Sequence, residues 1–366
     1  MRILLSLPLF LLVASLQAQK TFPLNDVADN RSGKFAFTHA TIIQQAGNMI
    51  SDATLIIENG KILRIGNNIP IPADAVEVNC EEKFIYPSFI ELYTDYGMPA
   101  VQKPATGFSY NSPVQLSSNT KGAYGWNQAI RSETGAISFF TVNELVAKGW
   151  RDLGFGAGLT HLKDGIARGT GTVVTFANQK ENKVILKEKA SAHFSFNKGS
   201  STQAYPNSMM GSIALLRQTH LDALWYRSNP SGEGVNLTLK HWNEQMSLPH
   251  IFEANDKWNA IRADRIGDEF GIQYVIKAGG NEYQRIKEMS ATKASFILPL
   301  NFPATMDVED ANNARYISLE DMRHWENAPF APAIFEKNKI PFCLTASDLK
   351  DPKEFWPALR KAIQYG

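Results

Sequence analysis

"YPSFIELYTDYG", residues 86–97, is the stretch that decides the fold. Its apolar first half predicts a buried strand, and its end carries Glu91, Tyr93 and Asp95 at every second position. Because strand side chains alternate between two faces, these three polar groups are expected to point the same way. Polar groups that project together from a strand end are typical of a binding or catalytic site.

Strand and helix patterns alternate beyond this stretch. Residues 98–135 are rich in Pro, Gly, Ser, Asn and Thr and predict a long loop region, which in compact domains is usually functional or covering. From residue 141 onward, apolar strands such as 340–346 are separated by segments with helical spacing. Strands separated by helices of about 10–15 residues predict a parallel sheet. Their number is near eight, which favours an α/β fold with a (β/α)8 TIM-like barrel over residues 81–366.

A small β-sandwich module is expected before the barrel, at residues 35–80. Its clearest signal is "ATLIIENGKILRIG", residues 53–66, in which Asn59-Gly60 separates two apolar runs. Asn-Gly is a strong two-residue hairpin turn signal. The module therefore contains at least one hairpin.

The first 18 residues predict a secretory signal peptide. A basic start at Arg2 precedes an apolar run from Ile3 to Ala14, and small or polar residues follow to Ala18. The run is shorter than the roughly 20 residues that cross a bilayer, although an uncleaved anchor is the alternative. We expect an exported protein, periplasmic or extracellular, with no stable membrane span after cleavage.

Composition excludes some function classes. The 366 residues have 44% apolar content and a net charge of +1, which describes a globular protein and gives no sign of a nucleic-acid partner. Only two cysteines are present, Cys80 and Cys343, so no thiolate metal site is expected. The aromatic pair in "DALWYRS", residues 222–228, follows helical spacing, which favours a packing role over a ligand platform.

The order of these elements resembles the amidohydrolase superfamily, in particular its imidazolonepropionase- and prolidase-like members. The resemblance covers roughly residues 35–366. It is carried by four runs in that order: 54–66, "GIARGTGTVV" (165–174), "HIFEANDKWNAIRADRIGDEFG" (250–271) and "IPFCLTASD" (340–348). It implies a metal-dependent hydrolase of non-peptide carbon–nitrogen bonds, with a divalent metal and a small-molecule substrate.

The metal ligands that the resemblance implies are replaced. The family ends its first barrel strand with Asp-x-His-x-His, whereas this chain has Glu91, Tyr93 and Asp95 there. The fifth strand ends in Glu253 where the family has histidine, and only Asp348, after the eighth strand, matches the family's catalytic aspartate. By the resemblance, Asp348 is the general base or a ligand, and Asp95 and Glu253 are oxygen ligands.

Three interpretations follow from these replacements. The barrel has lost its metal and hydrolysis, or it binds a carboxylate-type ion such as Mg²⁺, Mn²⁺ or Ca²⁺, or the strand alignment is displaced. The absence of paired imidazoles argues against zinc. Three converging carboxylates would repel one another unless they bind a hard cation, pair with Lys or Arg, or take up protons.

The seven histidines offer no alternative metal motif. No two lie within five residues of each other, so there is no His-x-His and no helical pair. His161 and His193 lie on predicted strands and are candidates to face the site. The remaining histidines are expected to be structural or exposed.

The chain ends at Gly366, in or just after the helix that follows the eighth predicted strand. The resemblance implies further helices and strands that complete the β-module, so we expect a fragment or a module completed by something else. The alternative function is a non-catalytic barrel that binds a ligand or supports a partner. Compatible partners are a small molecule, a downstream domain or a second copy of the chain.

Overall fold

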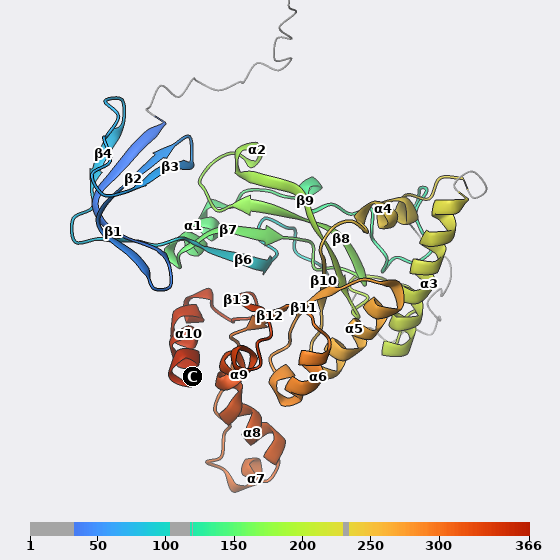
Figure 1. Ribbon diagram of the computed structural model, residues 1–366. Helices are drawn as coiled ribbons and strands as arrows, with labels where there is room; N and C mark the ends of the chain where they lie inside the picture. Colours follow the sequence, from blue (N-terminus) through green and yellow to red (C-terminus); the bar gives the residue numbers. More distant parts are fainter. Residues whose placement is uncertain (1–32, 103–117, 119, 230–233) are drawn as a thin grey trace, which may run out of the picture. The chain divides into compact units, whose positions relative to one another are not determined.

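The computed structural model describes residues 33–102, 118, 120–229 and 234–366. The chain divides into two compact units, with the boundary between Pro87 and Ser88 (Figure 1). The expected signal peptide, residues 1–18, lies outside the described residues, as do residues 103–117 and 119 of the expected loop region 98–135.

The first unit contains one five-stranded sheet, in the order β3-β2-β1-β4, with β5 also paired to β1. Its strands are β1 Lys34–Gln45, β2 Asn48–Glu58, β3 Lys61–Gly66, β4 Val76–Asn79 and β5 Phe84–Ile85. The described residues thus form a single layer rather than the sandwich expected from the sequence. Because β5 pairs with β1, residues 84–85 belong to this unit, and the boundary lies later than the expected residue 80.

The hairpin predicted at Asn59-Gly60 is confirmed. Asn59 has φ 51° and Gly60 has φ 74°, the left-handed pair that a type I′ turn requires. The turn places Glu58 opposite Lys61 and continues the antiparallel pairing of β2 with β3. Buried side chains of β1 and β2 form the core of this unit together with Cys80.

The second unit is built on an eight-stranded sheet in the order β13-β12-β11-β10-β9-β8-β7-β6 (Figure 1). Its strands are β6 Phe89–Thr94, β7 Phe155–Thr160, β8 Ala167–Thr175, β9 Ile185–Ser195, β10 His250–Glu253, β11 Tyr274–Lys277, β12 Phe296–Pro299 and β13 Phe342–Thr345. The predicted strand number is therefore found, and the strands follow one another in chain order.

One strand departs from the expected parallel arrangement. β8 runs antiparallel to both β7 and β9, whereas the other neighbouring pairs are parallel. A parallel connection needs a crossover of about a dozen residues or more. The link from Thr160 to Ala167 is too short for one. The all-parallel prediction is wrong here because β7, β8 and β9 form a meander.

The helices of the described residues all belong to the second unit. They are α1 Glu144–Asp152, α2 Glu181–Val184, α3 Met209–Ser228, α4 Leu237–Gln245, α5 Lys257–Phe270, α6 Ile286–Ala291, α7 Ala311–Ala314, α8 Leu319–Asn327, α9 Ala331–Lys337 and α10 Phe355–Gln364. Four short 3-10 segments join them in the described residues: Ala136–Ser138, Glu282–Arg285, Ala328–Phe330 and Pro352–Glu354. Among the described helices, none combines the length and apolar character needed to cross a bilayer.

The boundaries of α5 show how the sequence sets them. The side chain of Asp256 accepts hydrogen bonds from the backbone nitrogens of Trp258 and Asn259, which caps the amino end. Gly271, with φ 68°, ends the helix in the left-handed conformation that glycine adopts without strain. Buried residues of α5 then pack in the core cluster that includes Phe252 and Ile276 of the sheet.

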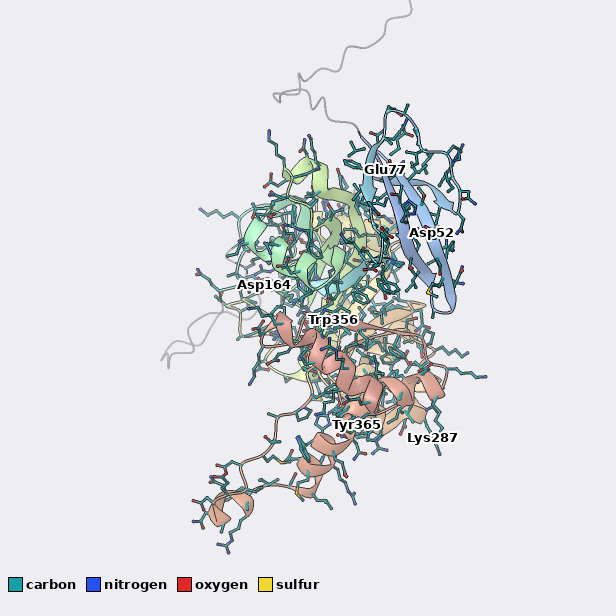
Figure 2. All side chains as sticks on the ribbon, turned by 90° about the vertical axis from the view of Figure 1, so that its left-hand side faces the viewer. Asp52, Glu77, Asp164, Lys287, Trp356 and Tyr365 are labelled. Atoms are coloured by element: carbon teal, nitrogen blue, oxygen red, sulfur yellow. The ribbon has the colours of Figure 1, made fainter. Side chains whose placement is uncertain are left out.

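The two ends of the eight-stranded sheet, β6 and β13, are connected by side chains. Trp356 of α10, labelled with Tyr365 in Figure 2, has its ring centroid 5.6 Å from that of Phe89 in β6. Thr345 of β13 donates a hydrogen bond to Glu91 of β6 at 2.5 Å. Backbone pairing in the described residues leaves β6 and β13 as the sheet's ends, so the closed TIM-like barrel stays a prediction.

Candidate functional site

Tyr93 is the centre of the candidate site. It lies on β6 and is 1% exposed. Its hydroxyl oxygen accepts a hydrogen bond from Nη1 of Arg168 on β8 at 2.8 Å and is also hydrogen-bonded to Glu253 of β10. The Nη2 of Arg168 lies 2.5 Å from Oε2 of Glu253. Three strands therefore contribute one closed polar group of phenol, guanidinium and carboxylate.

Burial decides the charges in this group. It raises the pKa of Tyr93 well above the ordinary phenol value, so Tyr93 is neutral. Burial would also raise the pKa of Glu253, but the positive charge and hydrogen bond of Arg168 hold that pKa below its usual value. Glu253 is thus ionised and neutralised by Arg168, and the group as a whole carries no net charge.

Two lysines lie over the ring of Tyr93. The Nζ of Lys163 is 5.0 Å from the ring centroid and the Nζ of Lys277 is 5.5 Å from it, both within cation–π range. Lys277, at the end of β11, pairs directly with Asp348 and also donates to the backbone oxygen of Ala278 at 2.8 Å. The ammonium of Lys277 is therefore held between Tyr93 and the carboxylate that follows β13.

Lys163 has its own partners. Its Nζ donates to the Oγ of Ser347 at 2.8 Å and lies 3.6 Å from Oδ1 of Asp95. The side chain of Asp95 is 64% exposed, so this carboxylate points away from the buried group around Tyr93. Alternation along β6 thus places Tyr93 in the interior but does not bring Asp95 to the same buried point.

His161 and His193 stack on each other beside Tyr93. Their ring centroids are 3.7 Å apart with 9° between the planes, and the His161 centroid lies 4.6 Å from that of Tyr93. Burial, followed by neighbouring positive charge, lowers both pKa values well below the ordinary histidine value, so both rings are neutral. His193 Nε2 is hydrogen-bonded to Ser191, whereas neither nitrogen of His161 has a partner among the described residues.

Glu91 joins strands rather than facing a ligand. It is 0% exposed, and its carboxylate accepts hydrogen bonds from Tyr93 N at 2.9 Å, Thr345 Oγ1 at 2.5 Å and Ala346 N at 2.9 Å. Burial raises its pKa above the usual carboxyl value, partly offset by these bonds. Glu91 thus shares a strand face with Tyr93 as expected, but its carboxylate oxygens form hydrogen bonds that link β6 to the end of β13.

The residues present do not fit the divalent metal that the resemblance implies. Asp95, Glu253 and Asp348 are each paired with a different cation: Lys163, Arg168 and Lys277 respectively. Within the described ranges, no group of three or more His, Cys, Asp or Glu side chains is placed to hold a metal ion. The three carboxylates named from the sequence are therefore not brought together as a ligand set.

Sequence reasoning missed the three cations. Arg168 lies in the run "ARGTGTVV", and Lys277 ends the apolar strand "YVIK". A lone arginine in a buried strand and a lysine at a strand's carboxyl end are the signals that could have identified them. Both are almost never buried without a partner, so each implies a carboxylate nearby.

A cavity of about 580 Å³ lies where β6 and β13 end. Asp95, Lys163 and Ser347 form its polar side, and Met98, Val146 and Trp150 are among its apolar lining residues. Lys163 thus connects the buried group at Tyr93 with a solvent-accessible space. The side chains of Lys163, Ser347 and Asp95 offer a ligand one ammonium group, one hydroxyl and one carboxylate.

Comparisons with known proteins give a structural likeness and no sequence match. No family model and no curated protein matches the sequence. Among solved structures, an amidohydrolase from Thermotoga maritima is 19% identical, with a TM-score of 0.67 over 91% of this chain and 84% of that one.

More distant structures include a prolidase complexed with N-methylphosphonate-L-proline and a Xaa-Pro dipeptidase with bound methionine. Each covers 91% of this chain and 84% of its own. They are 9% and 11% identical, with TM-scores of 0.44 and 0.42. At these identities the likeness concerns the fold alone, and the evidence for that fold is the similarity to the Thermotoga structure. The chain therefore shares its overall fold with the Thermotoga amidohydrolase.

Proposed function

We propose that the chain is an exported protein of the amidohydrolase type whose second unit binds a small molecule without a metal-activated water. One observation carries the proposal: each of the three carboxylates expected as metal ligands, Asp95, Glu253 and Asp348, is paired with its own cation. Export is supported only by the sequence pattern of residues 1–18. A downstream domain or a second copy as partner stays a prediction.

A zinc centre needs neutral imidazoles whose lone pairs converge on one point. The lone pairs of His161 and His193 lie in nearly parallel ring planes 3.7 Å apart, so they do not converge. Tyr93 is a neutral phenol already bonded to Arg168. The chemistry that these residues supply is therefore charge pairing and hydrogen bonding.

A hard cation such as Mg²⁺ or Ca²⁺ would need several carboxylates released from their partners. Removing Glu253 from Arg168 would leave a guanidinium that is only 4% exposed without its counter-charge. Separating a buried pair in this way costs about 3–5 kcal/mol. Any affinity for the metal would have to exceed that penalty, which favours the ion pairs over the metal.

The cavity at the ends of β6 and β13 is the proposed ligand site. Lys163 reaches it and is supported there by Ser347 at 2.8 Å. An ammonium and a hydroxyl at one wall suit a carboxylate or amide oxygen, and the apolar residues opposite suit a side chain or an acyl group. Small N-acyl amino acids combine these features.

A second candidate is a metal-dependent hydrolase of carbon–nitrogen bonds, which the likeness to the Thermotoga amidohydrolase favours. In that case Asp348 would have to leave Lys277 and serve as the general base or a ligand. The two candidates therefore differ at Asp348 and in their response to metal.

One experiment separates them. The purified protein is incubated with N-acetyl amino acids and Xaa-Pro dipeptides, with and without added Zn²⁺ or Mn²⁺, and product is measured for wild type and Asp348→Asn. The exposed Asp268→Asn is the control. The proposal predicts no metal-stimulated turnover. Turnover that requires metal and is lost only in Asp348→Asn would establish the hydrolase and overturn the proposal.

Binding is tested by calorimetry with the same N-acetyl amino acids. We expect Lys163→Met to weaken binding about tenfold or more, since it removes a charge-assisted contact. Lys148→Met, which breaks only an exposed pair with Asp152, should leave binding unchanged. If wild type binds none of these compounds at millimolar concentration, or if both lysine variants bind as wild type does, the proposed ligand site is wrong.

A further inference from the structure

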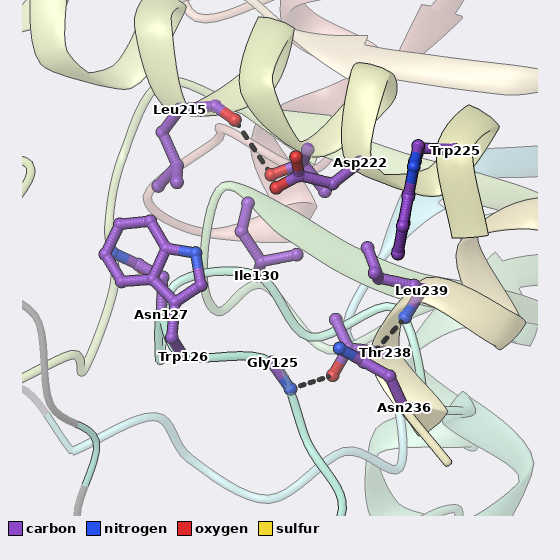
Figure 3. Close-up of a pocket in the computed structure, with 11 residues that line it drawn as sticks. Gly125, Trp126, Asn127, Ile130, Leu215, Asp222, Trp225, Asn236, Thr238 and Leu239 are labelled. Carbon is purple, nitrogen blue, oxygen red and sulfur yellow. Dashed lines mark hydrogen bonds between the residues drawn. The ribbon is translucent and has the colours of Figure 1, made fainter. Parts of the chain in front are cut away.

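A second cavity, of about 420 Å³, lies between α3, α4 and the segment around residues 125–130 (Figure 3). Its apolar surface is formed by Ile130, Leu215 and Leu239. Figure 3 shows the indole rings of Trp126 and Trp225 on opposite sides of Ile130. None of these residues belongs to the group around Tyr93.

The two indoles are more accessible than core packing requires. Trp126 is 39% exposed and Trp225 is 48% exposed, whereas Tyr226, the next residue on α3, is 8% exposed. The sequence favoured packing over a ligand platform for both aromatic residues of "DALWYRS"; Tyr226 is buried, whereas Trp225 is half-exposed and lines the cavity. The ring of Trp126 is held by stacking on Tyr205, with centroids 6.0 Å apart and 22° between planes.

Most polar groups of this cavity are already used by the fold. Four polar residues of the lining have side-chain hydroxyl or amide groups that hydrogen-bond to the backbone or to neighbouring side chains: Asn127, Thr219, Asn236 and Thr238. Asp222 differs, because its Oδ1 accepts one bond from Gln218 at 2.6 Å and no ion pair neutralises it in the described part of the chain. Among the described residues that line the cavity, it is the one that carries a charge.

We infer that this cavity binds a small organic cation, of the alkylammonium or quaternary ammonium class. Indole faces attract such cations through their negative quadrupole. The carboxylate of Asp222 supplies the opposite charge, and the aliphatic residues accept the cation's methyl groups. A metal ion would need several oxygen ligands, and a sugar would need several open hydrogen-bonding groups, which this lining does not offer. The inference is independent of the function proposed for the second unit's central site.

Choline and its uncharged isostere 3,3-dimethyl-1-butanol provide matched probes, because they differ in charge and hardly in shape. Binding to the full chain is followed by calorimetry and by tryptophan fluorescence. We expect saturable binding of choline, with the isostere binding at least about tenfold more weakly. If the isostere binds as well as choline, or if choline shows no saturable binding at millimolar concentration, the inference is wrong.

Two variant pairs locate the site. Asp222→Asn should weaken choline binding about tenfold or more, while Asp264→Asn, at another half-buried helix aspartate, should not. Trp225→Leu should remove most of the fluorescence response and weaken choline, while Trp258→Leu, at a tryptophan of similar exposure, should leave the affinity unchanged. Each variant is first compared with wild type by thermal melting. Choline binding that survives both cavity variants would place it elsewhere and overturn the inference.

Discussion

Arg168→Met tests the central ion pair most sharply, because it removes one charge and leaves the other partly buried. The side chain of Arg168 is 4% exposed and that of Glu253 is 23% exposed. Breaking a fully buried pair costs about 3–5 kcal/mol, and the partial exposure of Glu253 places our estimate at the lower end, about 3 kcal/mol. For a unit of this size, that lowers the melting temperature by about 6–12 °C.

The assay is urea or thermal unfolding of four proteins: wild type, Arg168→Met, Glu253→Gln and the double variant. The double variant carries no unpaired charge at this pair. We therefore expect its loss of unfolding free energy to be about 2 kcal/mol smaller than the sum of the losses in the two single variants. The control is Arg217→Met, which breaks an exposed pair with Glu269 and should cost less than about 1 kcal/mol.

The pH dependence supplies a second readout with a definite sign. In wild type, Arg168 holds the pKa of Glu253 below the ordinary value of 4.5, so the pair stabilises the protein above pH 4.5 and this stability is lost as pH falls further. In Arg168→Met, burial should raise the pKa of Glu253 above 4.5, so the destabilisation of the variant relative to wild type should shrink as the pH falls toward 5. A loss below about 1 kcal/mol, or one that Glu253→Gln does not relieve, would refute the reasoning.

Three further predictions concern the surroundings of Tyr93. His161 and His193 stay neutral in the folded protein but protonate near pH 6.5 in the unfolded chain, so their contribution to the free energy of unfolding is fully present above that pH and falls below it by at most about 2.7 kcal/mol per pH unit. Melting curves of His161→Phe at pH 7.5 and 5 should show about half that pH dependence, and an unchanged dependence would contradict the prediction. Glu91→Gln should lower the free energy of unfolding by about 2 kcal/mol, since an amide side chain cannot accept hydrogen bonds from all three donors. An unchanged urea midpoint would show that these hydrogen bonds do not stabilise the fold. Gly169→Ala should destabilise the protein by more than about 1 kcal/mol, because Gly169 has φ +75° and the new Cβ would lie 1.8 Å from the carbonyl oxygen of Thr134. A melting temperature equal to that of wild type would contradict this prediction.

The sequence could predict the strand that carries Tyr93 because alternation and apolar content are local properties. The same reasoning placed His161 and His193 toward the site, and the structure puts both rings beside Tyr93. Arg168 could not be paired from sequence, since its partner Tyr93 lies 75 residues away and depends on the direction of β8. That direction follows from a short connection, which the expectation of repeated βαβ units overlooked.

The carboxylates show a second limit. The sequence places Asp95, Glu253 and Asp348 at strand ends, and repulsion implies that they need counter-charges. It does not say whether a metal or a side chain supplies the charge, because Lys163 and Lys277 come from other strand ends whose spacing is set only in the folded sheet. The choice between metal site and ion pairs therefore required the three-dimensional structure.

The most direct test of the replaced metal centre is a metal titration of the purified full chain. After dialysis against a chelator, Zn²⁺ and Mn²⁺ are added, the excess is removed, and bound metal per chain is measured by plasma mass spectrometry for wild type and Asp348→Asn. If Asp348, Glu253 and Asp95 are held in ion pairs, we expect well below one equivalent of bound metal per chain, with no difference between wild type and Asp348→Asn. One tightly held equivalent in wild type that disappears in Asp348→Asn would contradict the account.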